Sequence, residues 1–259
     1  MISKLTLYFF TFLFIVNCTS KAPSAFIEET YAVKLDTITL QDTSRNRTIP
    51  VAFYSPDAKN KIHNQQIVIF SHGYGQNKGR DYLHYSYLTE NLASKGYFVV
   101  SIQHELPTDE LIPMEGKPQV VRMPFWERGA ENILFVLNEL KKIKPELDYE
   151  HLTLIGHSNG GDMTVLFATK YPEKVFKIIT LDHRRMYLPK TSAPKIYTLR
   201  SNDYPADEGV LPSPEEQQKY HITVQPTSIN HGQMDDKANP EERKILNSYI
   251  LNYLREPHF

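Results

Sequence analysis

The sequence is short of the residues from which several kinds of site are built. Its 259 residues include a single cysteine, Cys18, so neither an intrachain disulfide nor a cysteine metal cluster can form. Lys and Arg number 29 against 30 Asp and Glu, which leaves none of the positive excess typical of nucleic-acid binding. No H-E-x-x-H pair, glycine-rich dinucleotide motif or phosphate-binding loop is present. We therefore expect no metal ion, no organic cofactor and no nucleic-acid partner.

The N-terminus has the pattern of a secretion signal. A short basic start over residues 1–4 precedes an apolar run over residues 5–16, which is too short to span a bilayer comfortably. Cys18, just beyond this run, resembles the lipidated cysteine of a bacterial lipoprotein. Asn17 departs from that pattern, because such signals prefer a small residue there.

These features predict three parts of the chain. Residues 1–20 would be a signal peptide or lipoprotein signal, residues 21–29 a tether, and residues 30–259 one domain of ordinary size. The protein would be exported, and either periplasmic or attached to a membrane through lipid on Cys18. An uncleaved apolar anchor with an incidental cysteine is the alternative.

Beyond the tether, apolar segments of strand length alternate with segments of helical spacing. Residues 66–70 have a buried-strand pattern, and residues 126–144 repeat apolar residues on one helical side until Pro145. The predicted strands are residues 48–54, 66–70, 97–102, 151–155, 175–181, 195–200 and 221–224. The predicted helices are residues 82–95, 126–144, 160–170 and 240–254. This alternation predicts an α/β fold, with a mostly parallel central sheet and helices on both faces.

In such a sheet a ligand lies beyond the carboxyl ends of the strands, so the residues after each strand are functional candidates. Two connections, residues 104–124 and 204–220, exceed ordinary lengths, and we expect them to form walls of a binding cleft. Four residues after strands are predicted to contact a substrate: His72, Gly73, His104 and His157.

A glycine-flanked serine lies at the end of one predicted strand. The run Gly156-His157-Ser158-Asn159-Gly160 matches G-x-S-x-G between a strand and a helix, which is typical of a nucleophile elbow. The serine stands there on a sharp turn, and the helix N-terminus presents N–H groups to the reacting centre. We predict Ser158 as nucleophile and the backbone N–H of Asn159 as a donor to a developing oxyanion. An ordinary strand-to-helix turn capped by Ser158 is the alternative.

A second glycine motif follows an earlier predicted strand. The run His72-Gly73-Tyr74-Gly75 has the H-G-x-G form that supplies the other donor of an oxyanion hole. Two donors are needed, because losing one typically costs a factor of roughly 10²–10³ in rate. We assign this role to the backbone N–H of Tyr74, with a glycine turn of no catalytic part as the alternative.

The general base and its acid must follow the serine along the chain. Of the histidines beyond Ser158, His231 lies in a polar loop between the last predicted strand and the last helix, where a base reaches the serine. Asp182 ends one predicted strand, and Asp203 follows the next one. Both remain candidates for the carboxylate that orients the imidazole, and Asp207 is a weaker third.

Several segments together resemble the core of platelet-activating-factor acetylhydrolase-like proteins. The similarity covers roughly residues 40–250 and implies the α/β-hydrolase fold, although the single motifs also occur in dienelactone-hydrolase-like and other α/β-hydrolases. In the acetylhydrolase family the acid follows the strand before the usual one. That implies Asp182, while Asp203 stands at the common position. The resembling segments are residues 70–75, 92–97, 100–104 and 156–161, and Leu181-Asp182 followed by Met186 and Leu188-Pro189.

The resemblance implies a serine esterase that forms an acyl-enzyme. Its substrate would be a small-molecule or lipid ester, including short-acyl and phospholipid esters. Only about a dozen residues separate Asp182 from the next predicted strand, where many relatives insert a lid, so we expect no large lid domain. A peptidase or amidase with the same triad, and a non-catalytic binding lipoprotein on a hydrolase scaffold, are the alternatives.

Overall fold

The computed structural model describes residues 30–256. The predicted signal, its cysteine and the tether lie outside the described residues, so these predictions are not tested. No helix among residues 30–256 is both long and apolar enough to cross a bilayer.

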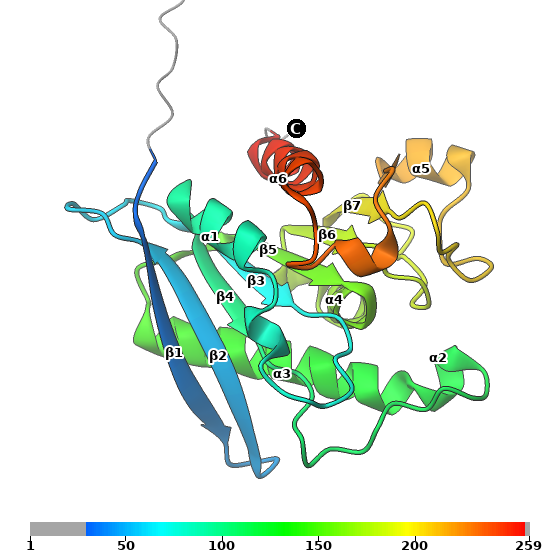
Figure 1. Cartoon of the computed structure of the whole chain (residues 1–259), viewed down its shortest axis with the longest axis horizontal. Coiled ribbons are helices and arrows are strands. Elements are labelled where there is room, and N and C mark those ends of the chain that lie inside the picture. Colours follow the sequence, from blue (N-terminus) through cyan, green and yellow to red (C-terminus); the bar gives the residue numbers. More distant parts are fainter. Residues whose placement is uncertain (1–29, 257–259) are drawn as a thin grey trace, which may run out of the picture.

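The described chain builds one eight-stranded sheet in the order β1-β2-β4-β3-β5-β6-β7-β8 (Figure 1). β2 runs antiparallel to β1 and β4, whereas β4, β3, β5, β6, β7 and β8 run parallel to one another. The predicted, mostly parallel sheet is confirmed. The strands are β1 (Val33–Asp42), β2 (Arg47–Pro56), β3 (Gln66–Ser71), β4 (Phe98–Ile102), β5 (Asp148–His157), β6 (Lys177–Leu181), β7 (Lys195–Arg200) and β8 (Thr223–Pro226).

Helices cover both faces of this sheet, as predicted (Figure 1). On β3, Ile67 and Ile69 pack into a core with α3 and α4, whereas Val68 and Phe70 pack into a second core with α1 and α6. This alternation follows from the two-residue period of a strand. The α-helices are α1 (Ser86–Ser94), α2 (Pro118–Val121), α3 (Met123–Ile143), α4 (Ser158–Lys170), α5 (Pro214–Tyr220) and α6 (Pro240–Arg255), and the 3-10 turns are η1 (Asp81–Leu83), η2 (Pro172–Lys174) and η3 (His231–Gln233).

The structure differs from the sequence-based expectations at some elements. The helix expected over residues 82–95 is divided into η1 and the shorter α1. β1 was not predicted, because it is an edge strand with mostly exposed or half-buried residues and no clean apolar alternation. The two expected cleft walls contain α2 and α5. Residues 182–194, between β6 and β7, contain no helix or strand, and the expected absence of a large lid is confirmed.

Candidate active site

The turn between β5 and α4 forces its serine into a strained conformation. Ser158 has φ 51°, in the left-handed region that L-residues rarely adopt, which costs about 1–3 kcal/mol. The two flanking glycines are required by contact. A Cβ on Gly156 would lie 2.4 Å from the Gly160 carbonyl oxygen, and one on Gly160 would lie 2.3 Å from the carbonyl oxygens of Ser71 and His72. Glycine therefore lets the elbow press against the end of β3.

Three side chains from separate loops meet at this serine. Ser158 Oγ lies 3.0 Å from His231 Nε2, and His231 Nδ1 lies 2.6 Å from Asp182 Oδ2. A carboxylate only accepts hydrogen bonds, so the imidazole proton is on Nδ1 and donates to Asp182. Nε2 is then free to accept the hydroxyl proton of Ser158. This arrangement has the geometry of an activated nucleophile, its base and an orienting acid.

Asp182 is held as an anion inside the protein. It follows β6 with φ 52° and is fully buried. Its Oδ1 accepts from the Ser201 backbone N–H at 3.0 Å and faces Arg200 Nη2 at 2.8 Å, and its Oδ2 also accepts from the Ser201 hydroxyl at 2.8 Å. Burial raises the pKa of Asp182, but the hydrogen bond from His231, the Arg200 charge and the Ser201 bonds outweigh it and lower that pKa to about 2.

The second acid candidate contacts a different part of His231. Asp203 Oδ1 accepts from the backbone N–H of His231 at 2.7 Å, and no bond from Asp203 to the imidazole is present in residues 30–256. Of the two acids left open by the sequence, Asp182 contacts the ring and Asp203 holds the main chain. Asp207, the third candidate, accepts from the side-chain amide of Gln119.

Two backbone N–H groups remain available near the serine. Within residues 30–256, no acceptor bonds the N–H of Tyr74 or that of Asn159, and Asn159 is in the first turn of α4. The Asn159 side chain is clamped: Trp126 Nε1 donates to its Oδ1 at 2.8 Å, and its Nδ2 donates to Glu105 Oε1 at 2.9 Å. This clamp orients the residue that follows the serine.

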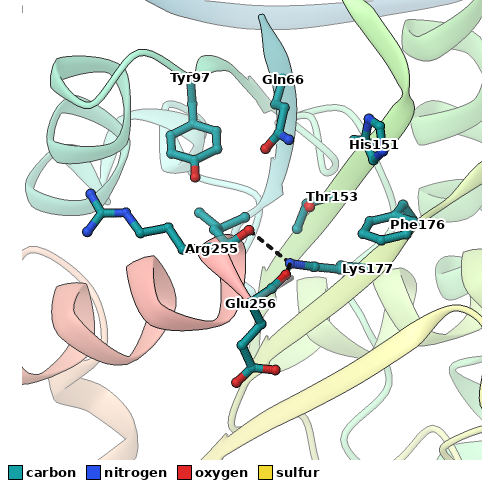
Figure 2. A pocket seen from close by; sticks show the side chains of 9 residues that line it. Gln66, Tyr97, His151, Thr153, Phe176, Lys177, Arg255 and Glu256 are labelled. Atoms are coloured by element: carbon teal, nitrogen blue, oxygen red, sulfur yellow. Dashed lines mark hydrogen bonds between the residues drawn. The ribbon is translucent and has the colours of Figure 1, made fainter. Parts of the chain in front are cut away.

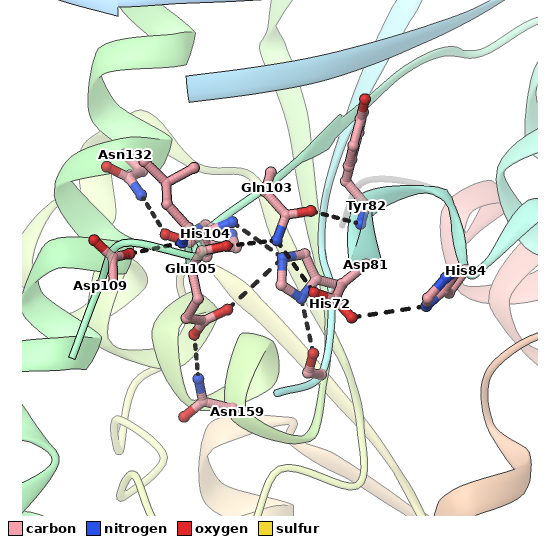
Figure 3. A network of polar contacts seen from close by, with 12 residues as sticks. His72, Asp81, Tyr82, His84, Gln103, His104, Glu105, Asp109, Asn132 and Asn159 are labelled. Carbon is pink, nitrogen blue, oxygen red and sulfur yellow. Dashed lines mark hydrogen bonds and ion pairs between the residues drawn. The ribbon is translucent and has the colours of Figure 1, made fainter. Parts of the chain in front are cut away.

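Two of the histidines predicted to contact substrate lie inside the protein instead. His72 and His104 are each 1% exposed, and Figure 3 shows them in a polar network behind the elbow. His72 Nε2 accepts from the His104 backbone N–H at 3.0 Å, so its Nδ1–H donates to the Gly73 carbonyl at 2.7 Å. Burial keeps both rings away from solvent and lowers the pKa of each, and their contact with a substrate stays a prediction.

The other two predicted substrate contacts are hydrogen-bonded within the protein. Gly73 N–H donates to the Tyr85 hydroxyl at 2.9 Å. His157 is 5% exposed, and its Nδ1 and Nε2 lie 2.8 Å from the Tyr85 hydroxyl and 3.2 Å from the His231 carbonyl oxygen. These bonds connect His157 to the loop that carries His231, and the contact of His157 or Gly73 with a substrate stays a prediction.

Sequence reasoning missed Glu105, which follows His104 in the same network (Figure 3). The side chain is buried, and burial raises its pKa to about 8. Its Oε2 has no hydrogen-bond partner in the described chain and lies 3.8 Å from His72 Nε2. A neutral carboxyl group fits this buried position, where Oε2 has no donor, better than a carboxylate. The only signal in the sequence was a charged residue in the loop that follows a buried strand.

Both expected cleft walls reach the site. The Tyr204 ring meets the His231 ring edge-on at 5.6 Å, and the Arg184 guanidinium lies over the other side of Tyr204 at 4.5 Å. From the other wall, the Ile112 N–H donates to the Tyr74 hydroxyl at 3.1 Å. These contacts place both long connections next to the catalytic candidates.

No group of three side chains that could hold a metal ion occurs in residues 30–256.

A separate cavity of about 260 Å³ lies at the amino ends of the parallel strands, where β3 and β6 begin (Figure 2). Lys177 lines it, and its ammonium donates to the carbonyls of Tyr253, Leu254 and Glu256. All three donors of the ammonium are thereby used. This cavity is remote from the serine and belongs to the end of α6.

Comparisons with known proteins found similar sequences over part of the chain and similar folds over most of it. No family model matches the chain. A probable 1-alkyl-2-acetylglycerophosphocholine esterase from Arthroderma benhamiae is 28% identical over 45% of this chain and 31% of its own length. A serine hydrolase-like protein from Mus musculus is 27% identical over 40% and 32%. The aligned part is thus about a third of the length of these curated relatives.

Solved structures match much more of the chain. A fungal esterase from Rhizomucor miehei has a TM-score of 0.63 at 14% identity and covers 88% of this chain and 84% of its own. A dienelactone hydrolase-like promiscuous phosphotriesterase from metagenomic libraries has a TM-score of 0.61 at 14% identity and covers 86% and 98%. The chain has the α/β-hydrolase fold. A bacterial heroin esterase is also similar, with a TM-score of 0.58, 14% identity and coverage of 86% and 84%.

Proposed function

We propose that this α/β-hydrolase is a serine hydrolase that cleaves carboxylic esters through an acyl-enzyme intermediate. One observation carries the proposal: Ser158 Oγ and Asp182 Oδ2 lie 3.0 and 2.6 Å from the two ring nitrogens of His231. A hydroxyl, an imidazole and a buried carboxylate in this order are the parts that acyl transfer requires. The names of the two curated relatives support the same class of reaction.

The proposed reaction has two stages. Ser158 Oγ attacks the ester carbonyl carbon while His231 Nε2 takes the hydroxyl proton, and Asp182 stabilises the resulting imidazolium. The backbone N–H groups of Tyr74 and Asn159 bind the tetrahedral oxyanion. Collapse expels the alcohol, which receives the proton from His231. Water then attacks the acyl group with His231 as base, and the carboxylic acid leaves from Ser158.

The proposed substrate is a small-molecule or lipid ester with a short acyl chain. The fungal relative is named for a glycerophosphocholine that carries an acetyl group. The absence of a large lid in residues 182–194 supports an ester presented at an open cleft over a long chain enclosed in a tunnel.

Active-site labelling tests this proposal on the full chain. We expect a fluorophosphonate to label the protein and p-nitrophenyl acetate to be hydrolysed faster than the palmitate ester. Ser158→Ala should abolish labelling and lower kcat by roughly 10⁵–10⁶-fold. Ser94→Ala, at the end of α1, should change neither. Labelling that survives in Ser158→Ala would refute the assignment.

The same assay separates the alternatives. A peptidase or amidase would be labelled too, but it would cleave peptide anilides better than p-nitrophenyl esters. A non-catalytic binding lipoprotein would be neither labelled nor active. Only faster ester cleavage, lost in Ser158→Ala, agrees with the proposal.

Export and lipid attachment at Cys18 remain part of the proposed role. The basic start, the apolar run and the single cysteine support them. Metabolic labelling with a palmitate analogue should mark the wild type and not Cys18→Ala. A wild-type protein that stays unlabelled, with the same size and location as Cys18→Ala, would exclude the lipid anchor.

A further inference from the structure

A continuous chain of hydrogen bonds connects three loops at the site. The Gly73 N–H lies 2.9 Å from the Tyr85 hydroxyl, which lies 2.8 Å from His157 Nδ1. On the other side of the ring, His157 Nε2 lies 3.2 Å from the His231 carbonyl oxygen. Both side chains are buried, with exposures of 4% for Tyr85 and 5% for His157. The triad geometry does not use either of them.

The direction of every bond in this chain follows from its chemistry. The Gly73 N–H can only donate, so the Tyr85 oxygen accepts from it and its own hydrogen is free to donate to His157 Nδ1. The His157 proton is then on Nε2 and donates to the His231 carbonyl. The other tautomer would place two acceptors, Nε2 and the carbonyl oxygen, face to face at 3.2 Å. Burial, followed by the charge of His231, lowers the pKa of His157 to about 3, so this ring is neutral.

Each end of the chain adjoins a group that the proposed reaction uses. Gly73 precedes Tyr74, whose N–H is assigned to the oxyanion, and His231 is the base. The fit is close: a Cβ on Gly73 would lie 2.9 Å from His157 Nδ1 and 3.1 Å from the Tyr85 hydroxyl oxygen. Phe70 packs on the Tyr85 ring with centroids 4.5 Å apart and limits its movement.

We propose that Tyr85 is a positioning residue. Through His157, it fixes the position of the loop that carries Tyr74 relative to the loop that carries His231. The inference rests on the proposed function. It explains why His231 is fixed at both sides of its main chain, with Asp203 at its N–H and His157 at its carbonyl. A displacement of about 1 Å between base and oxyanion donors can cost roughly 10²-fold in rate.

The neutral state of His157 is part of this role. Its ring centroid lies 4.8 Å from that of His231. A second cation at that distance would oppose the imidazolium that forms when His231 takes the serine proton. A neutral ring that donates from Nε2 supports the base without opposing its charge.

Removing the Tyr85 hydroxyl tests the inference. Tyr85→Phe leaves the Gly73 N–H and His157 Nδ1 without partners, and we expect kcat for p-nitrophenyl acetate to fall about 10–100-fold with KM within threefold. Tyr197→Phe is the matched control, since its buried hydroxyl donates to Glu256 at the far edge of the sheet. We expect it to lower thermal stability and leave kcat within twofold. An equal loss of kcat in both variants, or a change under twofold in Tyr85→Phe, overturns the inference.

A second pair of variants keeps the test decisive if Tyr85→Phe folds poorly. Gln at position 157 can accept from Tyr85 and donate to the His231 carbonyl, whereas Leu can do neither. We expect His157→Gln to retain at least tenfold more kcat than His157→Leu, and equal losses would contradict the inference. Fluorophosphonate labelling separates the two proposals. If Ser158 is labelled and these variants behave as wild type, only the positioning role fails; if the wild type is neither labelled nor active, the proposed function fails.

Discussion

β6 has a buried charged residue at each end, and the two ends have different partners. Lys177 (Figure 2) begins the strand and is 2% exposed. Its ammonium is bonded to three backbone carbonyls at the end of α6. Asp182 directly follows the strand, is fully buried, and bonds to His231. Backbone carbonyls cannot change charge, but an imidazole can. The chemistry of the partner, and not burial of the charge, separates a structural site from a reactive one.

The positions of these two ends follow from the direction of the parallel strands. The loops that follow β3, β5, β6 and β7 all lie at the carboxyl ends of these strands. The N-terminus of α4 lies at the same end of the sheet. At the amino ends, the carbonyls of a helix C-terminus need donors instead. The cation Lys177 is therefore stabilised by the carbonyls at the C-terminus of α6, and the anion Asp182 lies at the end of the sheet where the N–H groups of α4 point.

The largest effect should come from removing the charge at the reactive end. Asp182→Asn should lower kcat by roughly 10³–10⁴-fold, because the amide no longer fixes the His231 tautomer or balances its cation. It should also cost about 3–5 kcal/mol of stability, since Arg200 loses its buried partner. Steady-state kinetics and urea unfolding measure both losses.

Asp203→Asn is the matched control for that variant. An amide oxygen can still accept from the His231 N–H, so we expect kcat to change by less than about tenfold. A larger loss in Asp203→Asn than in Asp182→Asn would reverse the assignment of the acid.

A smaller effect, confined to stability, should follow at the structural end. Lys177→Met leaves the last carbonyls of α6 without their donors, and we expect the free energy of unfolding to fall by about 2–3 kcal/mol. The kcat of the folded protein should not change. Lys174→Met, at a lysine that is 37% exposed and pairs with Glu173, should cost less than about 0.5 kcal/mol. A fall in kcat of Lys177→Met would show that the site at the amino end of β6 affects the candidate active site at its carboxyl end.

The smallest effect concerns two neutral histidines near the reactive end. Burial lowers the pKa of both His157 and His183 to about 3, with the charges of His231 and Arg200 contributing next. The unfolded chain has ordinary histidines with pKa near 6.5 and binds more protons between these values, so unfolding becomes easier as the pH falls. We expect a loss of about 1 kcal/mol for each histidine between pH 7 and 5.5.

Urea unfolding at several pH values measures this slope. His157→Gln should reduce the loss of stability between pH 7 and 5.5 by about 1 kcal/mol, whereas His63→Gln, at an exposed position, should leave it unchanged. A pH dependence that is the same in His157→Gln as in the wild type would show that this ring is not held neutral.

Elements with strong local patterns could be predicted from the sequence. β3 and β7 are buried on both faces, and their central residues are mostly apolar, so the sequence predicted both strands with nearly correct bounds. β1 was not, because an edge strand has no obligatory apolar face. α5 was missed although Ser213 and Glu216 form a capping box around Pro214, a signature that is visible in the sequence.

The amino-acid order alone singled out Ser158, His231 and the two glycine motifs as candidates, because a strained turn between strand and helix requires particular residues at fixed spacing. It left Asp182 and Asp203 equivalent, since both follow parallel strands at the same edge. Their roles were separated by the contacts of the folded loops, where one carboxylate meets the imidazole and the other meets the main chain. Tyr85 has no local signature, and Glu105 has only its place after a buried strand. The roles of both depend on which distant groups are buried against them, and burial is a property of the packed chain.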